Sequence, residues 1–169
     1  MRRSTRPSPR ISDRPPVGTV ELRFTPLTSH VRTARLVAAT LARRFGLAEE
    51  ALDEVRLAVG ETCARAVALH QALGIDESVV VVLEDGPNAF SVQVEDFGPP
   101  DAPEPEPGLS LAVVTGLVDD VVVERGPRGR RVRMVWPASR RSASSPAEAA
   151  EQAALAAGPV GTPTPYGGG

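Results

Sequence analysis

The spacing of two charged residues, Glu61 and Arg65, is the first feature of the sequence that could perform chemistry. They stand in the segment ETCARAVALH, and residues four apart lie on the same face of a helix. A glutamate carboxylate can act as a general base, whereas an arginine has no acceptor atom and a permanent charge, so Arg65 cannot ligate a metal ion. The simplest expectation is an ion pair between Glu61 and Arg65, worth about a few tenths of a kcal/mol if exposed.

Two loops hold the other residues of chemical interest. Asp96 and Gly98 end a strand-like stretch, where an acidic residue before a turn is also common without any function. Gly108 and Leu109 lead into an apolar helix, and helix N-termini bind anions through unpaired N–H groups. Proline removes a backbone donor and fixes φ, so Pro99 and Pro100 keep the first loop from the conformations open to glycine. Glu104 and Glu106, just ahead of Gly108, would repel phosphate.

The elements that must position these residues can be predicted from periodicity. Residues 20–24 alternate apolar and charged side chains, which predicts a half-buried strand. Two helices with apolar stripes follow, separated by Gly46: Val31, Ala34, Ala38, Leu41 and Phe45 form the first stripe, and Leu52, Val55, Val59, Cys63 and Ala66 the second. Ser29 can cap the first helix, and His70 lies near the end of the second, where a positive ring would complement the helix dipole.

The remaining elements complete a mixed pattern of helices and strands. Residues 78–96 predict two strands around a turn at 85–88, a short helix follows the proline-rich loop, and residues 121–136 predict a hairpin turning at 126–129. The order is strand-helix-helix-strand-strand-helix-strand-strand. We therefore expect an α+β fold, a two-layer sandwich in which helices cover one face of a mostly antiparallel sheet.

Composition limits both the size of the domain and its partners. The ends differ from the middle, so we expect a disordered basic leader at 1–18, one domain at 19–137, and a disordered Ala/Pro/Gly-rich tail at 138–169. With a net charge of −2, the chain has no global positive field for nucleic acid or an anionic membrane. No apolar run reaches the roughly 18–20 residues of a membrane helix, and the single cysteine, Cys63, suits a core position in a cytoplasmic protein.

Residues from about 21 to 137 resemble the anti-sigma-factor serine kinases, which have the GHKL (Bergerat, histidine-kinase-like) ATPase fold. The resemblance rests on HVRTARLVAATLARRFGL, LDEVRLAVGETCARAVALH, VQVEDFG and RVRMVWP. It implies that Glu61 is the general base toward a partner's serine and that Asp96 accepts a hydrogen bond from the adenine amino group. It also implies that Gly98, Gly108 and Leu109 belong to the nucleotide site.

The sequence departs from this family at four positions of the nucleotide site. Arg65 replaces the asparagine that ligates Mg²⁺, Pro100 and Ser110 replace glycines, and arginines follow Gly129 where a threonine is usual. Arg65 could instead contact the phosphates of ATP directly. We expect ATP binding to be weakened or lost, and Mg²⁺ not to bind.

Three functions agree with this resemblance. The first is an anti-sigma regulatory factor, a homodimer that binds a sigma factor and/or an anti-anti-sigma (STAS-domain) protein without turnover. Its first helix offers arginines outside the apolar stripe, which could contact an acidic partner or form a merely solvated face: Arg32, Arg35, Arg43 and Arg44. The alternatives are an active ATP-dependent serine/threonine kinase with Glu61 as base, and a fragment related to sensor histidine kinases.

Overall fold

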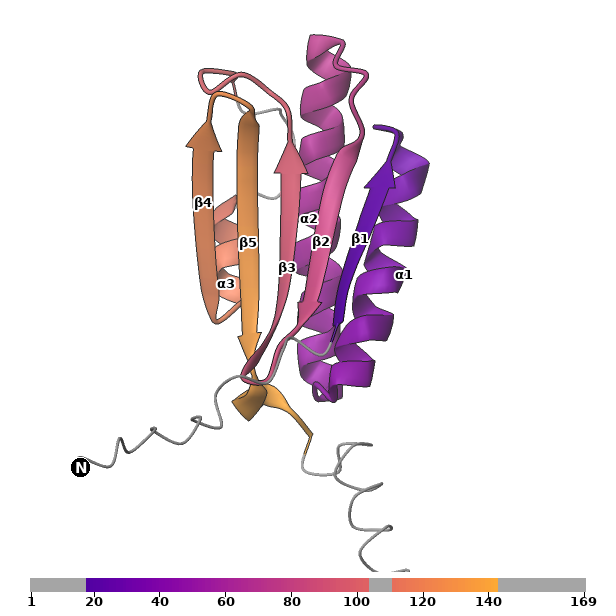
Figure 1. The fold of residues 1–169 in the computed structure, drawn as a ribbon, viewed down its shortest axis with the longest axis vertical. Coiled ribbons are helices and arrows are strands. Elements are labelled where there is room, and N and C mark those ends of the chain that lie inside the picture. Colours follow the sequence, from indigo (N-terminus) through magenta and orange to yellow (C-terminus); the bar gives the residue numbers. More distant parts are fainter. Residues whose placement is uncertain (1–17, 104–110, 143–169) are drawn as a thin grey trace, which may run out of the picture.

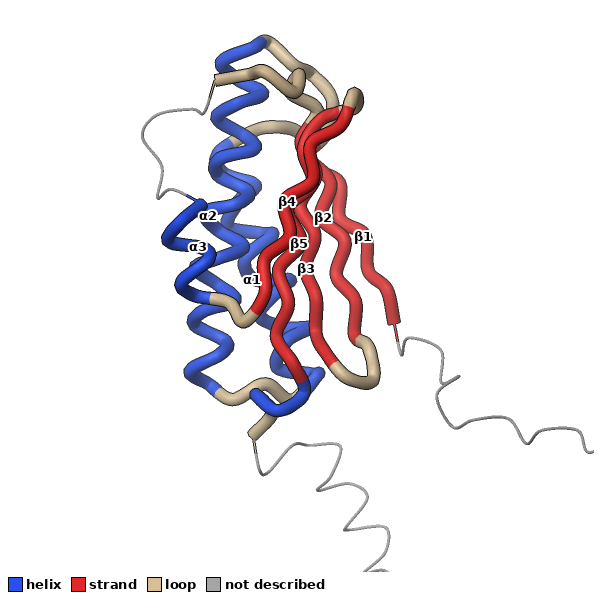
Figure 2. The backbone as a smooth tube through the Cα atoms, turned by 90° about the vertical axis from the view of Figure 1, so that its left-hand side faces the viewer, coloured by secondary structure: helices blue, strands red, loops and turns tan. Residues whose placement is uncertain are grey.

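The described chain folds into a single antiparallel sheet with three helices on one of its faces (Figures 1 and 2). The computed structural model describes residues 18–103 and 111–142. The strands are β1 Gly18–Phe24, β2 Val79–Asp85, β3 Ala89–Asp96, β4 Asp120–Gly126 and β5 Gly129–Pro137, and the helices are α1 Thr28–Phe45, α2 Glu49–Leu73 and α3 Leu111–Leu117. The five strands pair in the order β1-β2-β3-β5-β4, all antiparallel, which confirms the expected fold class.

The core lies between the helices and the inner face of the sheet. Alternation along the strands turns one set of side chains inward, so that Val81 lies opposite Val94 and Val94 opposite Val132. The predicted apolar stripes of α1 and α2 pack against this row, and most of their residues are buried. Gly46 ends α1 with a positive φ of 96°, as glycine at a helix C-terminus commonly does.

The outer face of the sheet is charged, and none of the helices in the described ranges covers it. Arg131 of β5 forms ion pairs with Glu95 of β3 at 3.0 Å and with Glu124 of β4 at 3.2 Å. The hydrogen bond to Glu95 contributes most to raising the pKa of Arg131, and the one to Glu124 raises it further. Cross-strand pairs of opposite charge suit a face in contact with water.

Two sequence-based details of the helix ends are wrong. Helix α1 begins at Thr28 after Leu27, with no side-chain cap, so Ser29 lies inside the first turn. His70 is fully buried, and its Nε2 accepts a hydrogen bond from the Phe97 N–H at 3.0 Å. A ring nitrogen that accepts a hydrogen bond is not protonated, so His70 is neutral and does not complement the helix dipole with a positive charge.

The domain extends slightly beyond the expected boundaries at both ends. Gly18 is the first residue of β1. After β5, Ala138–Arg140 form a 3-10 helix, and Arg140 bonds both Glu54 of α2 and Asp119 before β4. The rest of the expected leader and tail lies outside the described residues, and no helix within the described ranges is long and apolar enough to cross a membrane.

Candidate functional site

An ion pair between Arg65 of α2 and Asp96 of β3 occupies the centre of the expected nucleotide site. The Nη1 atom of Arg65 lies 2.8 Å from Oδ2 of Asp96, and the two side chains are only 9% and 3% exposed. This differs from the expected helical pair with Glu61. The reason is geometric: the Arg65 side chain turns toward the sheet, where a buried carboxylate is a stronger partner than an exposed one.

The second oxygen of Asp96 is also engaged. Its Oδ1 accepts hydrogen bonds from the backbone N–H of Gly98 at 3.2 Å and of Arg130 at 3.4 Å. One carboxylate thus joins α2, the loop after β3 and the start of β5. The acceptor that the resemblance assigns to the adenine amino group is therefore shared among three donors of the protein itself.

The described residues pack closely on the α2 side of this carboxylate. A Cβ atom added to Gly98 would lie 2.4 Å from Cδ2 of Leu69, so the loop packs directly against α2. A cavity between α2 and the loop after β3, lined by Leu69, Asp96, Gly98, Pro99 and Pro100 among others, measures about 10 Å³, which is about the space of one water molecule. A larger cavity of about 560 Å³ lies toward the outer face of the sheet, and Asp96 lines it together with Glu95, Phe97, Glu124 and Arg131 among others.

Gly129 and His70 position the segments that surround Asp96. Gly129 has a φ of +127°, and an added Cβ would lie 1.9 Å from the Asp96 carbonyl oxygen, so only glycine fits there. His70 approaches the Glu77 carbonyl oxygen with Nδ1 at 3.0 Å while Nε2 accepts from Phe97. The ring therefore ties the end of α2 to the residue after Asp96. Sequence reasoning missed this role, because a histidine in a helix carries no signal of its distant backbone partners.

The other predicted residues of the nucleotide site are only partly accounted for. Glu61 lies on α2 one turn before Arg65 and is partly exposed. Gly108 and Leu109 lie outside the described residues. Among the residues that the structure describes, no three His, Cys, Asp or Glu side chains gather in a way that could hold a metal ion.

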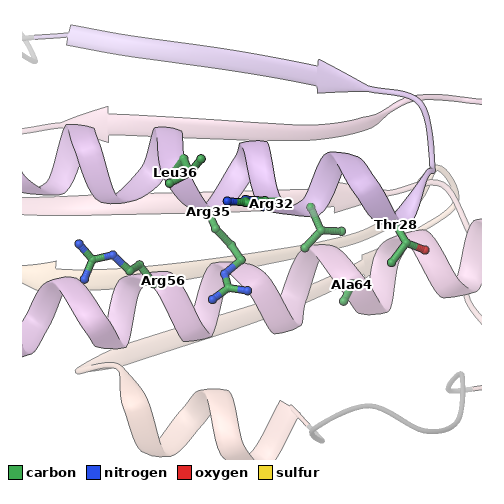
Figure 3. A pocket seen from close by; sticks show the side chains of 7 residues that line it. Thr28, Arg32, Arg35, Leu36, Arg56 and Ala64 are labelled. Atoms are coloured by element: carbon green, nitrogen blue, oxygen red, sulfur yellow. The ribbon is translucent and has the colours of Figure 1, made fainter.

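A second candidate site is a groove between α1 and α2, on the side of the helices away from the sheet (Figure 3). It measures about 400 Å³ and is lined by Thr28, Val31, Arg32, Arg35, Leu36, Arg56 and Ala64. Arg35 reaches from α1 across Gly60 of α2, whose added Cβ would lie 2.8 Å from the Arg35 Cδ. Leu36 beside it is 59% exposed.

Only two of the four predicted partner-binding arginines line this groove. Arg32 and Arg35 do, and Arg56 joins them from α2, where it also pairs with Asp53. Arg43 in the last turn of α1 instead pairs with Glu49, the first residue of α2, at 3.3 Å, and Arg44 is exposed at the same end of α1. Sequence reasoning missed Arg56 because this residue lies on α2, and only the packing of α2 against α1 brings it beside Arg32 and Arg35.

Comparison with known proteins identifies the class to which this fold and site belong. Residues 24–136 match the model of the histidine kinase-like ATPase domain, so the chain belongs to that family. Among solved structures it is similar to the RsbU and RsbW domains of Rv1364c from Mycobacterium tuberculosis, with 19% identity and a TM-score of 0.56. That match covers 71% of this chain and 32% of the other, so this chain spans about a third of that structure's length. No curated protein matches the chain.

Proposed function

We propose that this protein is an anti-sigma regulatory factor of the serine-kinase type that acts by binding, with its nucleotide pocket closed by its own Arg65. Its partners in this proposal are a sigma factor and/or an anti-anti-sigma (STAS-domain) protein, and it works as a homodimer. The family match, and the fold shared with a structure that contains an RsbW domain, support the proposed function as a regulator. The observation that supports loss of ATP binding is the 2.8 Å pair between Arg65 and Asp96.

The pair acts against ATP in two ways. Arg65 stands where the resemblance places the metal ligand, and a guanidinium cannot take that role because it has no acceptor. The same side chain engages the Asp96 carboxylate, so adenine would have to displace a buried ion pair. Breaking such a pair is unfavourable, since it leaves a charge buried without its counter-ion.

An active serine/threonine kinase is the second candidate. The partial exposure of Glu61 favours it, because a general base must be accessible to the hydroxyl that it deprotonates. This function requires Arg65 to leave Asp96 and contact the phosphates instead, which would place its charge where Mg²⁺ acts in relatives.

Calorimetric titration with ATP, with and without Mg²⁺, tests the two candidates. We expect no measurable binding by the natural protein and measurable binding by Arg65→Asn, because the shorter neutral side chain frees Asp96. Arg56→Asn, the same change on the same helix but outside the pocket, is the matched control and should behave as the natural protein. Tight, Mg²⁺-independent binding by the natural protein would overturn the closed pocket, and transfer of the γ-phosphate to a STAS-domain protein would establish the kinase.

Binding is tested separately, by biolayer interferometry against sigma factors and STAS-domain proteins encoded by the same genome. A partner bound equally well with and without ATP supports the proposal. Binding that appears only with ATP would contradict a regulator that works without nucleotide.

A further inference from the structure

The groove between α1 and α2 concentrates positive charge (Figure 3). Three guanidinium groups line it, from Arg32 and Arg35 of α1 and Arg56 of α2, and none of the described residues that line it is acidic. Within the described ranges Arg32 and Arg35 form no ion pair, whereas Arg56 pairs with Asp53, whose side chain is 79% exposed. Like charges three residues apart on a helix repel each other, so an anion bound between them would be stabilised.

The side chain of Arg35 is positioned by its packing on α2. It crosses that helix at Gly60, where an added Cβ atom would lie 2.8 Å from the Arg35 Cδ and 3.1 Å from its Nε. A larger residue at position 60 would therefore displace the arginine from its path. A side chain that is already packed loses less conformational entropy on binding a ligand, which favours binding at Arg35.

Apolar side chains complete the lining of the groove. They come from Val31, Leu36 and Ala64, and Leu36 is 59% exposed, so it has apolar surface left to bury. The hydroxyl-bearing Thr28 lies among them. A volume of about 400 Å³ falls within the range of about 300–1,000 Å³ that is typical of small-molecule sites, which combine an apolar lining with a few polar groups.

These side chains define the chemistry of a fitting ligand. A guanidinium group donates hydrogen bonds and accepts none, so the polar end of the ligand must be an anion with acceptor oxygens. The planar fork of arginine matches a phosphate group, with two parallel hydrogen bonds. The neighbouring apolar side chains favour an apolar body attached to that phosphate.

We propose that the α1–α2 groove binds a small phosphate ester with an apolar body, whose phosphate contacts Arg32, Arg35 and Arg56. The site is separate from the nucleotide pocket around Asp96. One consequence rests on the proposed function: a bound phosphate ester engages the arginines that an acidic protein partner would contact, so the ligand should release that partner.

Calorimetric titration of the full chain with 1-naphthyl phosphate tests the site. Inorganic phosphate lacks the apolar body and 1-naphthol lacks the charge, so the two compounds separate the contributions of the groove. We expect 1-naphthyl phosphate to bind at least about tenfold more tightly than either compound. Binding no tighter than that of inorganic phosphate would overturn the inference.

Two substitutions locate the bound probe. Arg35→Gln removes a charged donor and should weaken binding of 1-naphthyl phosphate about tenfold, whereas Arg44→Gln, the same change on α1 outside the groove, should not. Leu36→Ala should weaken it a few-fold, with Leu73→Ala at the end of α2 as the matched control. Equal losses for Arg35→Gln and Arg44→Gln would show a general charge effect and overturn the site.

A competition experiment tests the regulatory consequence. Saturating 1-naphthyl phosphate should weaken binding of an acidic partner, measured by biolayer interferometry, and unchanged affinity would overturn the release while the site stands. Because the titrations use neither nucleotide nor partner protein, their failure leaves the proposed regulator intact. Conversely, a protein that binds no sigma factor or STAS-domain protein can still bind the probe.

Discussion

Two arginines on neighbouring helices illustrate two different uses of the same side chain. Arg65 of α2 is almost fully buried and bonded to Asp96, beside a cavity of about 10 Å³. Arg35 of α1 is exposed in a groove of about 400 Å³, among other cations and an exposed leucine. The first arginine is bound inside its own domain, whereas the second is available to another molecule.

Desolvation explains why this difference matters. A guanidinium removed from water is tolerated only with a partner, and Asp96 is a buried partner of Arg65. An arginine that keeps its water, as at position 35, contributes little to folding and retains its attraction for acidic surfaces. Substitutions at the two positions should therefore affect different measurable quantities.

The largest effect on stability is expected from Asp96→Ala. The change removes the carboxylate from the buried Arg65 and the acceptor from the N–H groups of Gly98 and Arg130. We expect the free energy of unfolding, measured in urea, to fall by about 3–5 kcal/mol.

A double-mutant cycle shows whether the ion pair is the cause. In an Arg65→Met background no charge at position 65 loses its counter-ion, so Asp96→Ala should lower stability by only about 1–3 kcal/mol, the effect of the lost backbone acceptors. An equal loss in both backgrounds would show that Arg65 and Asp96 are not coupled, and the closed pocket would have to be abandoned.

A smaller effect, on binding instead of folding, is expected from Arg35→Glu. Reversing a charge in the groove should weaken binding to an acidic partner by about tenfold, mainly through the association rate. Stability should change by less than about 0.5 kcal/mol, because Arg35 is exposed.

Arg44→Glu is the matched control for Arg35→Glu. It makes the same charge change on the same helix but outside the groove, at the end of α1. Equal loss of affinity for the two variants, measured against the same partner, would show a general charge effect and no role for the groove.

The sequence predicted elements that depend on local patterns. Alternation in residues 20–24, the apolar stripe through Val55 and Val59, and the turn at 126–129 all correspond to observed elements. These succeed because burial of a periodic face decides whether a segment becomes a helix or a strand.

The details of the site depended on contacts between distant segments, which periodicity does not encode. Arg65 and Asp96 are 31 residues apart, and both were singled out, but the sequence offered Glu61 as the nearer partner. The place of His70 in the helix suggested that a positive ring would complement the helix dipole, although its backbone partners require a neutral ring. Arg56 had no signal at all, because only helix packing places it beside Arg32 and Arg35.

The smallest expected effect, from Gly60→Ala, separates the shape of the groove from its charge. The new Cβ would lie 2.8 Å from the Arg35 Cδ, so the flexible arginine must move while the backbone stays in place. Alanine favours a helix by up to about 1 kcal/mol, so unfolding in urea should require equal or higher denaturant. Partner affinity should nevertheless fall a few-fold, since Arg35 no longer lies across α2. Gly116→Ala in α3, where an added Cβ meets nothing within 4 Å, should leave affinity unchanged. If Gly60→Ala also leaves it unchanged, the position of Arg35 across α2 is irrelevant to binding, and only its charge can matter.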